Sequence, residues 1–146
     1  SKEELFAAAM RQLMSTISDT LVYQLGKADT PLARARAIIH ANLSEPLYSH
    51  RNCFVWLQFW SETARSEELA RLERINSQRF HRNLLDALSK LLSREEAEKV
   101  AVELVAMVDG LWIRKAQADD SITPEAARSL VFAYLDRRLG SASGAE

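Results

Sequence analysis

The stretch that decides the fold runs from Val100 to Ile113 and reads Val-Ala-Val-Glu-Leu-Val-Ala-Met-Val-Asp-Gly-Leu-Trp-Ile. Between Val100 and Val108 its only polar residue is Glu103. A helix on a protein surface needs one apolar stripe, whereas this segment is apolar nearly all round and has to be covered on two sides. The stretch also contains Asp109 and is too short to cross a bilayer. We therefore interpret it as a covered helix of a water-soluble protein.

A second segment, from Leu130 to Leu135, has no polar residue at all and belongs to the last predicted helix. Few elements of the chain remain to bury this apolar surface. A second copy of the protein, packed across a two-fold interface, is the simplest way to bury it. The alternative is that the chain itself wraps one of the two segments. We favour a homodimer formed by the last two helices, with these interface residues: Val100, Leu104, Val108, Leu111, Leu130, Val131 and Tyr134.

The composition is that of one ordinary globular domain. Of 146 residues, 47% are hydrophobic and 27% are charged, and a net charge of −1 argues against a strongly basic nucleic-acid binder. Four glycines and three prolines are too few for the many tight turns of a sheet protein, which favours long helices. A single cysteine excludes an intrachain disulfide, and no signal peptide is visible, so we expect a cytoplasmic protein.

Helix start signals and apolar periodicity divide the chain into six helices of an all-α bundle. Capping boxes open two of them, at Ser1 and at Ser93, and Thr-Pro pairs open two more. We expect Gly26 to end the first helix in a left-handed conformation. The expected ranges are about 2–25, 31–43, 47–64, 66–92, 94–118 and 124–139, within a domain of residues 1–139 followed by a flexible tail of residues 140–146.

The residues that enzymes and metal sites require are not grouped in this sequence. The three histidines lie far apart, there is no cluster of cysteine and histidine, and no glycine-rich phosphate loop or nucleophile elbow is present. Cys53 lies in an apolar stretch, where a free cysteine is usually inert. We therefore expect no catalytic residue, no metal and no cofactor.

A cluster of aromatic residues is the remaining candidate for chemistry. Trp56 and Trp60 are four residues apart and share a helix face with Phe59 beside it, and Asp109 and Trp112 share a face of a later helix. A quaternary ammonium ion cannot donate hydrogen bonds, so ring faces and a balancing carboxylate are what bind it. These five residues are our candidate ligand site. The alternative is that the rings are ordinary core, since spacing alone does not show that the two faces meet.

The opening Ser1-Lys-Glu-Glu-Leu-Phe6, followed by Ala and Met10, resembles the segment that follows the recognition helix in TetR-family repressors. Four later stretches are similar to the BetI group of that family: 56–60 (Trp-Leu-Gln-Phe-Trp), 69–76, 108–114 (Val-Asp-Gly-Leu-Trp-Ile-Arg) and 126–139. The resemblance implies a C-terminal ligand-binding and dimerisation domain whose first helix is the connector to a DNA-binding head. Because the chain starts at a capped serine, we expect the helix-turn-helix head to be missing from it.

BetI-type proteins repress genes that convert choline to glycine betaine, and choline relieves the repression. The resemblance therefore implies choline as inducer, a pocket inside the helical body, a four-helix dimer interface, and operator DNA bound only through the head, with no membrane partner. We expect choline to enter between the helices of Trp56 and Asp109, with the first helix acting as a lever. The alternatives are a related regulator of another cationic or apolar ligand, a helical dimerisation or scaffold module without a ligand, and, least favoured, an enzyme.

Overall fold

The computed structural model describes residues 1–118 and 122–143, and it confirms an all-α fold. Its six helices are α1 (Lys2–Leu25), α2 (Pro31–Asn42), α3 (His50–Glu62), α4 (Glu67–Leu88), α5 (Arg94–Ala118) and α6 (Pro124–Ser143). Within those residues there is no strand, and no helix is both long and apolar enough to span a bilayer.

Side-chain caps start the helices where the sequence predicts them. The Ser1 hydroxyl accepts from the amide of Glu4, whose carboxylate reaches back to complete the capping box. The hydroxyls of Thr30, Ser93 and Thr123 likewise accept from first-turn amides of α2, α5 and α6.

Three predicted boundaries and one predicted cap conformation need correction. Helix α3 begins at His50, because the Ser49 hydroxyl caps it by accepting from the amide of Asn52. Helix α4 ends at Leu88, with the Ser89 amide closing its last turn. Helix α6 continues through Gly140 to Ser143, where a tail was predicted, and residues 144–146 lie outside the described part. Gly26 ends α1 in a right-handed conformation, with φ of −61°, so no left-handed cap forms.

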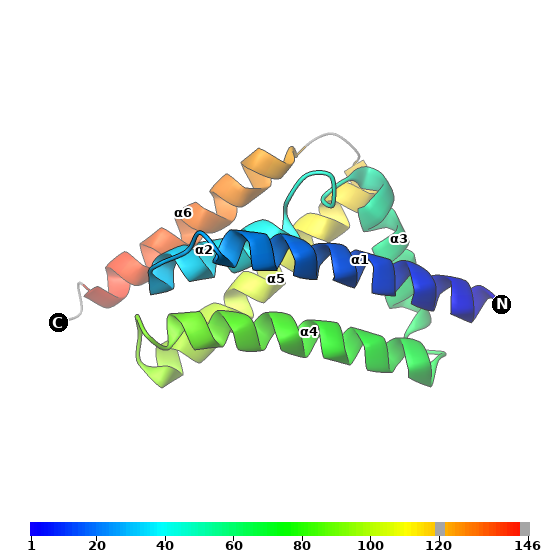
Figure 1. The fold of residues 1–146 in the computed structure, drawn as a ribbon, viewed down its shortest axis with the longest axis horizontal. Helices are drawn as coiled ribbons and strands as arrows, with labels where there is room; N and C mark the ends of the chain where they lie inside the picture. Colours follow the sequence, from blue (N-terminus) through cyan, green and yellow to red (C-terminus); the bar gives the residue numbers. More distant parts are fainter. Residues whose placement is uncertain (119–121, 144–146) are drawn as a thin grey trace.

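Helix α5 is the centre of the packing. Helices α3, α4 and α6 all pack against it, while α1 and α4 lie side by side across the molecule and α2 fills the space between them and α6 (Figure 1). This arrangement explains the apolar Val100–Ile113 stretch, because its own chain covers it on more than one side.

The same packing corrects the predicted dimer interface. Val100, Leu104 and Val108 of α5 and Val131 of α6 are buried in the core of the single chain, so they have no surface left to offer a partner. The other three predicted interface residues keep exposed surface: Leu130 is 53% exposed, and Leu111 and Tyr134 are half-buried.

Candidate functional site

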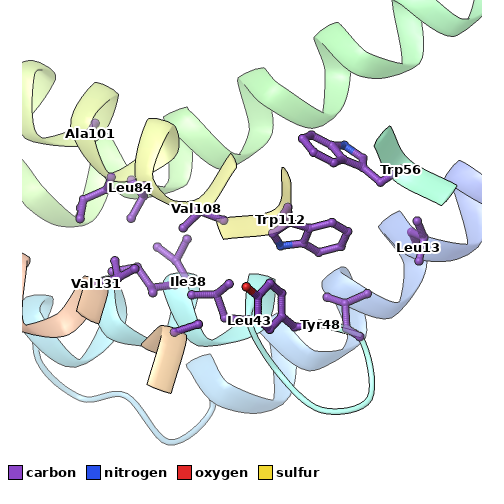
Figure 2. Close-up of a cluster of buried hydrophobic side chains, with 14 of the residues drawn as sticks. Leu13, Ile38, Leu43, Tyr48, Trp56, Leu84, Ala101, Val108, Trp112 and Val131 are labelled. Atoms are coloured by element: carbon purple, nitrogen blue, oxygen red, sulfur yellow. The ribbon is translucent and has the colours of Figure 1, made fainter. Parts of the chain in front are cut away.

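Three of the five predicted site residues meet around one cavity between α1, α3, α4 and α5. Trp56 of α3 and Trp112 of α5 face each other edge to face, with ring centroids 5.6 Å apart and planes inclined by 71° (Figure 2). Asp109 lies one helical turn before Trp112 and lines the same cavity. The complete lining is Met10, Leu13, Ile17, Asn42, Trp56, Glu73, Asn76, Ser77, Phe80, Val105, Val108, Asp109 and Trp112.

A hydrogen bond to α2 and a ring contact with Tyr48 hold the Trp112 ring in place. Its indole Nε1 donates to the backbone carbonyl of Asn42, at the end of α2, over 2.9 Å. The Tyr48 ring lies 6.3 Å from Trp112, and the Tyr48 hydroxyl donates to the carbonyl of Leu111 over 2.8 Å. Trp112 is therefore held in a fixed position, with its only polar atom already satisfied.

The other two predicted residues, Phe59 and Trp60, are not among those that line the cavity. Phe59 is 1% exposed and belongs to the core, as the alternative interpretation proposed. Trp60 is 41% exposed and stacks on Trp56, with centroids 5.3 Å apart and planes inclined by 14°. Trp60 thus supports Trp56, and the i, i+4 spacing correctly predicted that their rings share a face.

Glu73 of α4 is a residue of this cavity that the sequence did not reveal. It lines the cavity together with Asp109, and its Oε2 atom is buried with no hydrogen-bond partner among the described residues. Burial, reinforced by the nearby Asp109 carboxylate, raises the pKa of Glu73 to about 7. Burial also raises the pKa of Asp109 to about 6. This cavity therefore holds two carboxyl groups with raised pKa values, and neither forms an ion pair among the described residues.

The cavity is small. Its volume of about 30 Å³ is the share of one water molecule in the liquid, too small for a ligand such as choline. An open groove of about 710 Å³ lies on the outside, between α4 and α5, and shares Ser77, Val105 and Asp109 with the cavity. Asp109 thus lines both spaces, whereas Glu73 lines the cavity alone, and the groove also has His81, Arg82 and Arg94 in its lining. An entrance between α3 and α5 stays a prediction.

Cys53 packs in the core beside this region. Burial raises the pKa of its thiol to about 12, so the thiol stays protonated at neutral pH and is a poor nucleophile. Among the described residues, no three histidine, cysteine or acidic side chains gather closely enough to hold a metal ion.

Sequence comparison places this chain among transcriptional regulators. Residues 31–140 match the family described as BetI-type transcriptional repressor, C-terminal. The chain is 34% identical over 143 residues to the HTH-type transcriptional regulator BetI of Stenotrophomonas maltophilia, covering 97% of this chain and 73% of that protein. It is 37% identical over 134 residues to the regulator of the same name from Brucella anthropi, covering 92% of this chain and 69% of the relative.

Solved structures agree on the fold. A crystal structure of a transcriptional regulator from Rhodococcus sp. Rha1 superposes with a TM-score of 0.72 at 25% identity, covering 97% of this chain and 73% of that one. A second crystal structure, from Pseudomonas aeruginosa PAO1, reaches a TM-score of 0.76 at 22% identity over 96% of this chain and 68% of that one, which shows a shared fold alone. Since the family match spans most of the helical body, this chain belongs to the BetI-type transcriptional repressors, within the TetR family.

Proposed function

We propose that these 146 residues form the effector-binding and dimerising part of a repressor, and that the effector is a small quaternary ammonium cation such as choline. The observation that carries the proposal is a cavity lined by two carboxyl groups, Glu73 and Asp109, together with the rings of Trp56 and Trp112. Among the described residues neither carboxyl group forms an ion pair, and the Oε2 atom of Glu73 is buried without a hydrogen-bond partner. Ring faces attract a cation and the carboxylates balance its charge. Family membership supports a regulatory role for this binding.

A cavity smaller than its ligand fits the role of an inducer site, because binding then requires a change in the helices around it. A trimethylammonium group is larger than a single water molecule, so the ligand can enter only if the helices around the cavity separate. Binding would then favour a second arrangement of the body, which is how an effector changes a distant DNA-binding activity. In this proposal choline relieves repression of genes for converting choline to glycine betaine.

Dimerisation is the second part of the proposal. Helix α6 packs on α5 and α2, and its Leu130 side chain is 53% exposed, while Leu111 of α5 and Tyr134 of α6 are half-buried. An exposed leucine in an otherwise apolar segment favours coverage by a partner. We expect the two-fold interface to involve Leu111, Leu130 and Tyr134.

A dimerisation module without a small ligand is the second candidate function. The small volume of the cavity favours it, because a nearly filled core needs no occupant. The two candidates differ in what the carboxyl pair does: in a ligand-free module it only costs stability, whereas in an effector domain it binds a cation.

Calorimetric titration of choline into the purified chain separates these candidates. We expect saturable binding of choline and no binding of 3,3-dimethylbutanol, the uncharged analogue of the same shape. Asp109→Asn should weaken choline binding about tenfold, the effect of losing roughly 1.4 kcal/mol of charge attraction. Absence of heat with millimolar choline, together with an intact dimer, would remove the cation and leave the dimerisation module.

A further inference from the structure

A second cavity, of about 40 Å³, adjoins the first one under the line where α1 packs on α4. Four residues line both cavities: Ile17 of α1, Asn42 of α2, and Asn76 and Phe80 of α4. These four side chains form a boundary that the two spaces share, and all four are half-buried. Rearrangement of the Phe80 ring would join the two cavities into one elongated site.

The two cavities differ in charge. The first has the two carboxyl groups of Glu73 and Asp109 in its lining, whereas no acidic side chain lines the second. The second cavity has instead the amides of Asn76 and Asn83 and the guanidinium of Arg79, all from successive turns of α4. Among the described residues no hydrogen bond is made by the Asn83 amide, so its N–H donors are free to meet a ligand.

We propose that the two cavities are the two ends of one effector site, which takes an ammonium ion carrying a hydrogen-bond-accepting tail. The ammonium end lies between the tryptophans and the carboxyl pair, and a carbonyl or ester oxygen of the tail accepts from Asn83 and Asn76. This proposal rests on the proposed function and refines the class of ligand. Asn83, which lines only the second cavity, is the residue that determines selectivity for the tail.

The position of α1 gives tail binding a mechanical consequence. Met10 and Leu13 of α1 line the first cavity, and Met14, Ser18 and Leu21 line the second, with Ile17 in both. A ligand that fills both spaces therefore contacts α1 from Met10 to Leu21, whereas a compact cation in the first cavity meets only Met10, Leu13 and Ile17. Ligands with a tail should displace α1 from α4 more completely than choline does.

The test compares two ligands of similar length in the same protein: acetylcholine, whose tail has acceptor oxygens, and pentyltrimethylammonium, whose tail has none. Calorimetry on the wild-type chain should give about tenfold tighter binding of acetylcholine, the value of one or two neutral hydrogen bonds. Asn83→Leu should reduce this ratio to about one. Because both ligands are measured in each variant, a general loss of affinity cancels in the ratio.

Gln78→Leu is the matched control. It also replaces a side-chain amide of α4 by leucine, but at a residue that lines the outer groove and neither cavity. It should keep the tenfold ratio. If Asn83→Leu does not fold, as judged by its helical circular dichroism, Asn83→Ala replaces it. Two results overturn the two-ended site while choline still binds. One is an acetylcholine-to-pentyltrimethylammonium affinity ratio of one or below in the wild type, and the other is an unchanged ratio in the Asn83 variant. Failure of all three cations to bind overturns the proposed function instead.

Discussion

Glu73 carries a carboxyl group whose buried oxygen has no partner among the described residues, and Asp109 lines the same cavity. Burial works against the charged form of both groups and raises their pKa values to about 7 and about 6. Ionisation of such a buried pair lowers the stability of the folded chain at neutral pH. A bound cation would offset this loss by balancing the negative charge. Stability and ligand affinity should therefore respond in opposite directions when these residues are changed.

Glu73→Gln should stabilise the protein at pH 8. The folded-state pKa of Glu73, about 7, lies above its ordinary value of 4.5, so the folded state holds the proton more tightly than the unfolded chain. The resulting stabilisation is complete below about pH 4.5 and is lost as the pH rises through about 7. We expect the variant to melt about 2–4 °C higher than the wild type at pH 8, and the difference to vanish at pH 4.5.

Glu68→Gln is the control on the same helix, because Glu68 is exposed and pairs with Arg11 at 2.9 Å. Its melting temperature at pH 8 should stay the same or fall slightly, as for other surface ion pairs. A Glu73→Gln variant that melts lower than the wild type at pH 8 would show that the Glu73 carboxylate has a stabilising partner.

Choline affinity should increase between pH 5 and pH 8. Both carboxyl groups are protonated at the lower pH and ionised at the higher one, since their pKa values of about 7 and about 6 lie between. A cation binds the ionised pair more tightly, so we expect the calorimetric dissociation constant to fall about tenfold over this range and to level off above pH 8. The same affinity at both pH values would place the cation away from the pair.

Among the elements, α6 is attached to α2 by two arginine contacts of unequal strength. Arg128 is largely buried, and its guanidinium donates to the Leu43 carbonyl, which ends α2, over 2.8 Å and to Glu45 over 3.2 Å. Arg36 of α2 pairs with Asp136 of α6 at 2.8 Å, but both side chains are about half exposed. Burial, rather than the number of ion pairs, should decide which contact secures the helix.

Arg128→Leu should lower the free energy of unfolding by about 1–3 kcal/mol, because it leaves the Leu43 carbonyl without its donor in a buried place. Asp136→Asn should cost less than about 1 kcal/mol, as for exposed pairs. Urea titration followed by circular dichroism measures both values. Equal losses in the two variants would contradict this ranking.

The helices themselves were largely predictable from the sequence, because their starts depend on local chemistry such as the Ser1, Thr30 and Thr123 caps. Trp56, Asp109 and Trp112 were selected from the sequence by ring and charge chemistry, and the structure places all three around one cavity, while their role in binding stays a prediction. Glu73 was not, because it is one of several charged residues on α4 and only the packing of α4 against α5 turns it inward. The buried positions of Val100 and Leu104 likewise depend on which helices cover α5.

At the scale of the whole molecule, a substitution at Leu130 tests whether α6 packs against the same helix of a second protomer. Leu130→Glu adds a charge at the expected two-fold interface, where burying it without a partner is costly, so the chain should become a monomer. Light scattering after size-exclusion chromatography measures this. Val22→Glu, at a residue of α1 that is 70% exposed, is the control and should leave the dimer intact. A dimer in both variants would place the interface elsewhere.

The three tryptophans form a continuous series of rings from the protein surface to the cavity: Trp60 stacks on Trp56, and Trp56 meets Trp112 edge to face. Excited states of indoles at 5.3 Å and 5.6 Å are strongly coupled, so light absorbed at one ring is shared with the others. Aqueous iodide can collide directly with the outer ring, while a cation in the cavity would perturb the inner two. The fold thus contains an intrinsic optical probe whose exposed end reports the solvent and whose buried end reports the occupant.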